Sequence, residues 1–108
     1  MVTVTVTGRP SSDAIRASGS NAVIVDLSGL PRIDSTGLAE LLKAQGELVR
    51  AGGRMAIIGA SDSVRGVFRA ARVDTLLECY SDEEQARASF SGAAYAAARQ
   101  RLAEFLES

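Results

Sequence analysis

The chain has 108 residues, a length that fits one domain, and its twelve basic residues nearly balance thirteen acidic ones. Its basic residues form no stripe that would favour nucleic acid, and no apolar run is long enough to cross a bilayer. The start lacks the features of a signal peptide, and a single cysteine, Cys79, excludes an internal disulfide. We expect a soluble cytoplasmic protein that binds neither nucleic acid nor membrane.

The absence of histidine restricts the chemistry further, because histidine is the commonest general base and metal ligand. Ser–His and Cys–His catalysis and histidine-based zinc sites are excluded. A hydrolase that pairs Ser35 with Asp34 is disfavoured, because adjacent residues at a helix start rarely point at each other and no base with a suitable pKa is available. No Gly-Lys-Ser/Thr follows Gly59 or Gly66, so a phosphate loop is absent. We therefore expect a protein that is not an enzyme and needs no cofactor.

The first half of the chain reads as strand, short helix, strand and long helix. Residues 2–7 (VTVTVT) alternate as in a half-buried strand, and a short helix is expected over 12–18. The continuous apolar run 22–27 is typical of a strand buried on both faces. After a loop at 28–34, apolar positions at helical spacing predict a helix over 35–51.

The second half continues this alternation. Gly52-Gly53 ends the long helix, and a strand is expected at 54–58. The following helix, 61–71, begins at a capping Ser61. The remaining expected elements are a strand at 75–79, a helix at 81–90 that starts with a Ser81–Glu84 capping box, and an amphipathic helix at 93–106.

Alternating strands and helices predict an α/β fold with a mostly parallel sheet and crossover helices. Because VTVTVT has one polar face, the helices should cover the two faces of the sheet unevenly. We expect residues 1–91 to form one domain and residues 92–108 to be an amphipathic helix packed on it. A role of that helix in a homodimer or in partner binding remains open.

The segment from Val23 to Leu38 (VIVDLSGLPRIDSTGL) carries the strongest functional signal. It places Ser35 at or near the cap of a helix, where outward N–H groups and the helix dipole stabilise an anion such as phosphate. Phosphorylation would add about −1.5 to −2 charges beside Asp34 and repel a docked partner. Gly37 is a poor helix former, and close approach of a partner's backbone is one reason for it. Ordinary helix capping is the simpler reading of Asp-Ser-Thr-Gly alone.

The extended segment VIVDLSGLPRIDSTGLAELL resembles the signature of the STAS family of anti-sigma-factor antagonists, and the resemblance continues through RMAIIGASDSVRGVFRAARVDTLLECYSDEEQA. It implies a domain that binds an anti-sigma factor with serine kinase activity and so frees a sigma factor. That kinase would phosphorylate Ser35, and a phosphatase would reset it. The docking surface implied by position contains Asp34, Ser35, Thr36, Gly37 and Leu38.

The N-terminal part departs from the family pattern. Only one strand precedes the first helix, and Gly8-Arg9-Pro10-Ser11 stands where Gly-Glu-Leu-Asp is usual. Ser11 takes the place of an acidic residue near the phosphorylation site, and Asp13 is the nearest substitute. We include both in the expected docking surface. The C-terminal helix is hypothesised to pack where the shortened first helix would have packed.

These departures keep a second family function open, a STAS module that is not phosphorylated and serves as a subunit of a lipid transporter or a stress-signalling assembly.

Other residues have simpler expected roles. Asp26 is expected to accept hydrogen bonds from loop amides, and Cys79 is expected to be a small buried hydrophobe. Three arginines are expected on a solvated helix face, from which they could contact an acidic partner: Arg65, Arg69 and Arg72.

Overall fold

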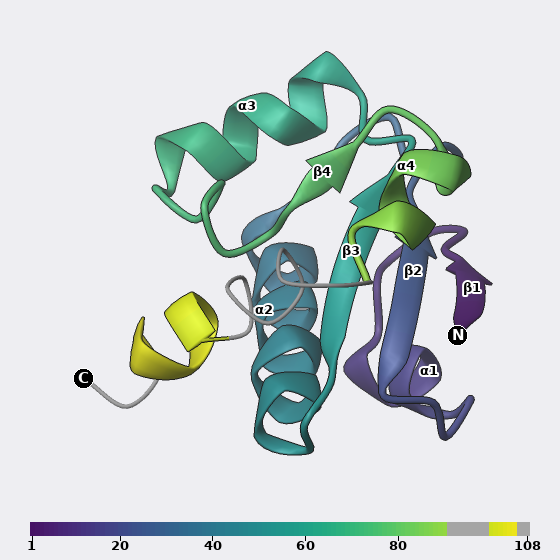
Figure 1. The fold of residues 1–108 in the computed structure, drawn as a ribbon. Helices are drawn as coiled ribbons and strands as arrows, with labels where there is room; N and C mark the ends of the chain where they lie inside the picture. The colour runs from purple at the N-terminus through teal and green to yellow at the C-terminus, as the bar shows by residue number, and fades with distance from the viewer. Residues whose placement is uncertain (91–99, 106–108) are drawn as a thin grey trace.

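A computed structural model describes residues 1–90 and 100–105, which form one sheet with helices packed on both faces (Figure 1). The elements in chain order are β1 (Val2–Thr5), α1 (Ser12–Arg16), β2 (Ala22–Asp26), α2 (Ser35–Arg50), β3 (Arg54–Ile58), α3 (Asp62–Ala70), β4 (Cys79–Tyr80) and α4 (Glu83–Ala88). This arrangement confirms the predicted α/β fold with crossover helices.

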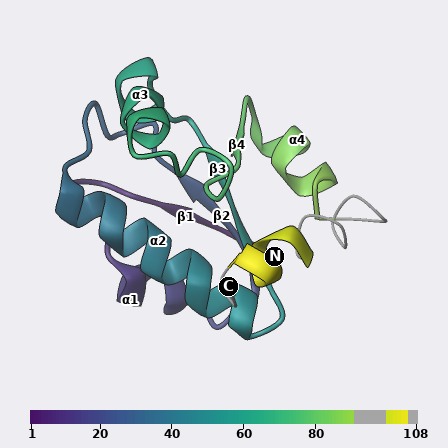
Figure 2. The same cartoon turned by 90° about the vertical axis from the view of Figure 1, so that its left-hand side faces the viewer.

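All described strands are parallel, and their order in the sheet, β1-β2-β3-β4, follows the order in the chain. Connections between parallel strands are almost always right-handed, so three crossovers that step in the same direction place α1, α2 and α3 on the same face. Helix α4 follows β4 and covers the opposite face. Figure 2 shows α1 and α2 on one side of the strands and α4 on the other.

The core is divided by the sheet into a large and a small cluster. On the large side, Val23 and Val25 of β2 and Met55 and Ile57 of β3 pack beneath α1, α2 and α3. On the small side, Ile24 and Ala56 pack against Ala86 of α4. Three consecutive buried residues in β2 confirm a strand buried on both faces, whereas alternate residues of β1 stay exposed. The uneven cover predicted from VTVTVT is therefore present.

Arg54 is the largest fully buried side chain and fastens α4 to the sheet. Its guanidinium donates to the Glu78 carboxylate at 3.0 Å, to the Tyr80 hydroxyl at 2.8 Å and to the Ser89 carbonyl at 3.0 Å. It also lies 4.6 Å from the centroid of the Phe90 ring. Burial raises the pKa of Tyr80 above its ordinary value. A charge that is paired and hydrogen-bonded in this way is tolerated in the interior.

Two predicted boundaries near the end of the sheet are wrong. The strand expected at 75–79 is limited to Cys79–Tyr80, because the Leu77 N–H bonds the Val73 carbonyl at 2.9 Å and folds the preceding residues into a turn. Helix α4 is capped by Asp82, which accepts from the Gln85 N–H at 2.8 Å, so the capping box expected from Ser81 does not form. The Ser81 hydroxyl instead donates to the Gln85 side chain.

The expected C-terminal helix at 93–106 lies partly outside the described residues, which omit 91–99 and 106–108. Residues 100–105 are helical, with Leu102 buried and Phe105 exposed. We expected this helix in the place left by the shortened α1, but Figures 1 and 2 show residues 100–105 beside α2 and away from α1. No helix in the described part of the chain is long and apolar enough to cross a membrane.

Candidate functional site

The candidate site lies at the start of α2, and its capping residue is Asp34. The Asp34 carboxylate accepts from the Gly37 N–H at 2.7 Å, and its backbone is extended, with φ −98° and ψ 176°. Ser35 is therefore the first residue of the helix and not its cap. The bond from Gly37, and to a smaller extent the Arg9 guanidinium, lowers the pKa of Asp34 despite some desolvation.

The five residues of the motif differ in exposure. Asp34, Ser35 and Thr36 are exposed, whereas Leu38 is half-buried and packs against the core. Gly37 is buried, and a Cβ there would lie 3.0 Å from Ile33 Cγ1 and 3.1 Å from Pro10 Cδ. The structure thus gives an intramolecular reason for Gly37, the close packing of two loops on the helix, in place of the expected approach of a partner's backbone.

The loop between β1 and α1 packs against the start of α2. Arg9 forms an exposed ion pair with Asp34 at 3.3 Å. Arg9, Pro10, Arg32, Ile33 and Asp34 line an open cavity of about 380 Å³. Neither arginine was predicted from the sequence as part of this site. Arg9 belongs to the unusual Gly-Arg-Pro-Ser segment, which could have drawn attention to it. The residues around Arg32 give no signal that it lines a cavity.

Ser11 and Asp13, which we expected in the same surface, have different settings. The Ser11 hydroxyl accepts from the Ala14 N–H at 3.4 Å and caps α1, so this side chain serves the fold. Asp13 is exposed in the first turn of α1, and within the described residues its carboxylate forms neither a hydrogen bond nor an ion pair. The structure brings the Arg9–Ser11 loop to Asp34, while Asp13 stays at its periphery.

The chemistry available at this site is that of an exposed hydroxyl in a charged setting. The Ser35 hydroxyl forms no hydrogen bond among the described residues, and it sits at the positive end of a 16-residue helix. The charges of Arg9, Arg32 and Asp34 sum to +1. A phosphate of about −1.5 to −2 would bring that sum to roughly −0.5 to −1. Modification would therefore reverse the sign of the surface, which is less strongly anionic than the sequence alone suggested.

Asp26, the other acidic residue of the motif, supports the loop that leads to this site. Its carboxylate accepts from the Ser28 N–H at 2.9 Å, which confirms the expected bond to a loop amide. Gly59, with φ +71°, passes so close that a Cβ would lie 2.7 Å from the Asp26 carboxylate. The strand end, the loop and β3 are thereby held together below the start of α2.

The fold and site define an α/β domain in which a buried strand leads to an exposed Asp-Ser-Thr helix start. The STAS domain family model matches residues 8–86, and the chain belongs to the STAS domain family. A comparison with curated proteins found no match.

Two solved structures share the fold. The NMR structure of the protein TM1081 has a TM-score of 0.69 and 18% identity, and the match covers 80% of this chain and 78% of the other. The crystal structure of tm1081 from Thermotoga maritima, described as a candidate anti-sigma factor antagonist, has a TM-score of 0.69 and 17% identity, with 81% and 86% covered. At this identity the likeness establishes the fold.

Proposed function

We propose that this protein is an anti-sigma-factor antagonist that docks on an anti-sigma factor with serine kinase activity, releases a sigma factor, and is inactivated by phosphorylation of Ser35. The observation that carries the proposal is the exposed Ser35 hydroxyl at the first position of α2, flanked by exposed Asp34 and Thr36. Membership of the STAS family and the description of the Thermotoga maritima protein support it.

The charges around Ser35 suggest how the switch works. Before modification, Arg9 and Arg32 give the surface a small positive charge, which suits a partner with an acidic contact surface. The phosphate would reverse that charge, and the N-terminus of α2 would stabilise it without a backbone rearrangement. Attraction to the partner would become repulsion, and a phosphatase would restore docking by removing the group.

The direct experiment is intact-mass analysis followed by phosphosite mapping on the protein recovered from its native cells. A singly phosphorylated species mapped to Ser35 is the expected result, and Ser35→Ala should abolish it. Ser28→Ala, which removes an exposed hydroxyl in the preceding loop, is the matched control and should leave modification intact. A Ser35 that stays unmodified in growth and stress would reject the switch and favour the non-phosphorylated STAS interaction subunit.

A further inference from the structure

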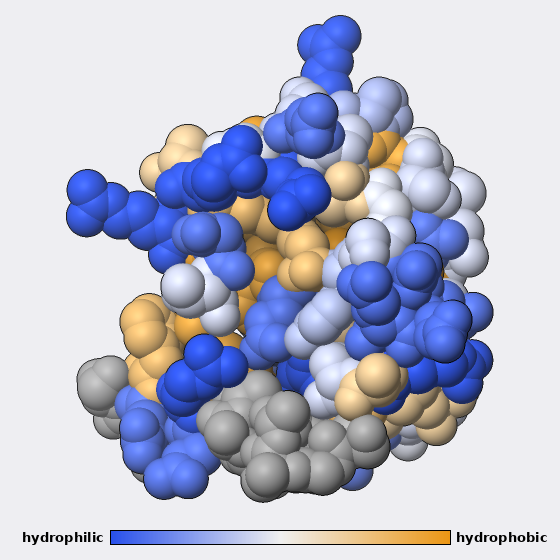
Figure 3. Space-filling view, turned by 45° about the horizontal axis from the view of Figure 1, so that its top comes forward, coloured by the Kyte–Doolittle hydropathy of each residue, from blue (hydrophilic) through white to orange (hydrophobic). Residues whose placement is uncertain are grey.

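A second surface, distant in sequence from Ser35, lies along β4, the last strand of the sheet. One open cavity of about 270 Å³ is lined by Arg65, Phe68, Arg69, Asp74, Leu77 and Cys79. A second, of about 340 Å³, is lined in part by Arg65, Cys79, Tyr80 and Gln85. Arg65 and Cys79 line both cavities, and we call the two cavities together the β4 groove. Figure 3 shows a hollow with hydrophobic residues inside and hydrophilic residues around it.

The backbone N–H and C=O of Cys79 have no hydrogen-bond partner within residues 1–90 and 100–105. The backbone carbonyl of Glu78 accepts from the Ile57 N–H at 2.8 Å, so the backbone polar groups of Glu78 point toward β3. Successive residues of a strand direct their N–H and C=O groups to opposite edges, so those of Cys79 face outward. An extended segment can therefore pair with β4 at this residue.

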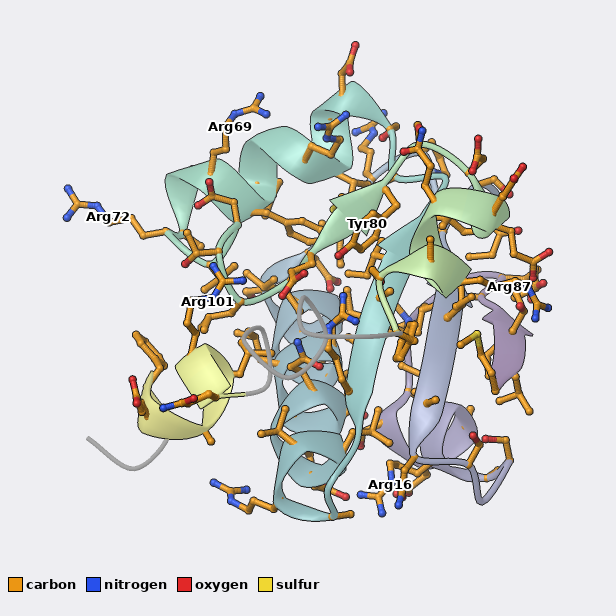
Figure 4. The ribbon with its side chains drawn as sticks, in the orientation of Figure 1. Arg16, Arg69, Arg72, Tyr80, Arg87 and Arg101 are labelled. Atoms are coloured by element: carbon orange, nitrogen blue, oxygen red, sulfur yellow. The ribbon has the colours of Figure 1, made fainter. Side chains whose placement is uncertain are left out.

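Arginines form the rim of the β4 groove. Arg65 and Arg69 line it, and Arg72 follows one turn later; all are exposed, and none takes part in an ion pair among residues 1–90 and 100–105. Figure 4 shows Arg69 and Arg72 pointing away from the ribbon. Asp74 is the acidic residue of the first cavity, so the sum over Arg65, Arg69 and Asp74 is +1.

Arg72 adopts a backbone conformation that costs less free energy for glycine than for arginine. Its φ is +61°, in the left-handed region, where it ends α3 in the position that usually holds glycine. Its N–H bonds the Arg69 carbonyl and the Val73 N–H bonds the Phe68 carbonyl, which defines this helix end. The left-handed backbone at Arg72 is costlier than it would be at glycine, and the exposed side chain adds a positive charge at the end of the helix that carries Arg65 and Arg69.

We propose that the β4 groove binds an acidic, partly aliphatic segment of a partner protein in an extended conformation. Carboxylates of the segment pair with Arg65 and Arg69, its apolar side chains cover the half-buried Ala60 and Cys79, and its backbone pairs with Cys79. Because β4 has only two residues, side-chain contacts supply most of the affinity. This surface does not include Ser35, so a partner held here stays bound whether or not Ser35 is modified.

The test is a titration of the isotope-labelled full chain with two synthetic hexapeptides, one alternating Glu and Val and one alternating Lys and Val. Saturable binding of the Glu-Val peptide is expected, with shifts of the Cys79 and Tyr80 amides. The Arg65→Glu, Arg69→Glu double variant should weaken that binding on the order of tenfold or more. The matched control is Lys43→Glu with Arg50→Glu, two exposed cations of α2, which changes the net charge equally and should preserve affinity.

Equal binding of the Lys-Val peptide, amide shifts confined to the start of α2, or equal loss of affinity in the two double variants would overturn the proposal. So would the absence of saturable binding. Ser35→Ala should bind the Glu-Val peptide as the wild type does, so the outcome is independent of the proposed phosphorylation switch. Arg72→Gly should weaken binding while leaving the fold intact, because glycine relaxes the backbone at that position.

Discussion

The side-chain carbonyl of Gln45 in α2 accepts a 2.9 Å hydrogen bond from the backbone N–H of Met55 in β3. Its side-chain amide donates to the Leu76 carbonyl at 2.6 Å. Because β4 pairs with β3 only at Ile57 and Ile58, this buried glutamine takes the place of a ladder partner where the sheet edge would otherwise be unpaired. One side chain thereby joins a helix, a strand and the turn before β4.

Replacement of Gln45 by leucine should lower the free energy of unfolding by about 1–3 kcal/mol, because the buried Met55 N–H and the half-buried Leu76 carbonyl lose their partner. Urea denaturation measures the change. Gln100→Leu, at an exposed position, should change the stability by no more than about 0.5 kcal/mol. Equal stability of Gln45→Leu and wild type would show that water or a local shift satisfies these groups.

The Arg54→Met substitution should lower the free energy of unfolding by about 3–5 kcal/mol, because the Glu78 carboxylate keeps the bond from the Tyr80 hydroxyl but loses its cation, and the end of α4 is released. Chemical denaturation gives the loss, and hydrogen exchange should show faster opening of α4 than of α2. Arg87→Met removes an exposed ion pair with Glu83 and should cost less than about 1 kcal/mol. Glu78→Leu added to Arg54→Met should restore part of the stability; a further additive loss would contradict the buried-pair explanation.

Alanine substitutions at the two adjacent glycines after α2 should measure backbone strain and steric overlap separately. Gly52 has φ +88° and open space around its Cβ position, so Gly52→Ala should cost about 1–2 kcal/mol of strain. At Gly53 a Cβ would lie 1.9 Å from the Asn21 carbonyl oxygen, which accepts from the Arg54 N–H at 2.8 Å. Gly53→Ala should cost about 2–4 kcal/mol through overpacking and loss of that bond. Thermal or urea unfolding measures both losses of stability. A larger loss in Gly52→Ala than in Gly53→Ala would contradict the prediction that steric overlap costs more than backbone strain here.

The cap at Asp34 should make stability depend on acid pH. Because folding lowers the pKa of Asp34 from its ordinary 3.8, the ionised cap contributes fully above that value. The contribution is lost as pH falls through the folded pKa. The stability advantage of wild type over Asp34→Asn should therefore shrink between neutral pH and pH values below 3.8 in urea titrations. Arg9→Gln should retain most of this dependence, because the Gly37 N–H is the larger cause; an equal advantage at all pH values would contradict the ionised cap.

The elements that the sequence predicts well are those with a clear period and clear ends. Nearby residues alone determine several elements. Examples are the alternation in β1, the apolar runs of β2 and β3, and the glycines that end α2. The segment 75–79 also looks apolar, but a local turn competes with pairing to β3, and the turn prevails over most of it. Asp82 and Ser81 are both good caps, and composition alone does not decide between them.

The position of Ser35 at a helix start was readable for the same local reason, while its charged neighbours were not. Arg9 reaches Asp34 across 25 residues of chain, and such a contact follows only from the packing of the loop on α2. Gln45 and Arg54 were missed because they break the expected apolar pattern of a helix face and a buried strand. Their polar groups are satisfied by partners that only the tertiary structure supplies.

The match between strand order and chain order has a consequence for synthesis. A nascent chain that leaves the ribosome from its N-terminus delivers β1 first, and each later strand joins the edge that the previous strand has just left open. None of the four described strands has to enter between two that are already paired, and each crossover helix is made together with the strand that it connects. The sheet can therefore grow in the direction of translation, with contacts that span one strand–helix–strand unit at a time.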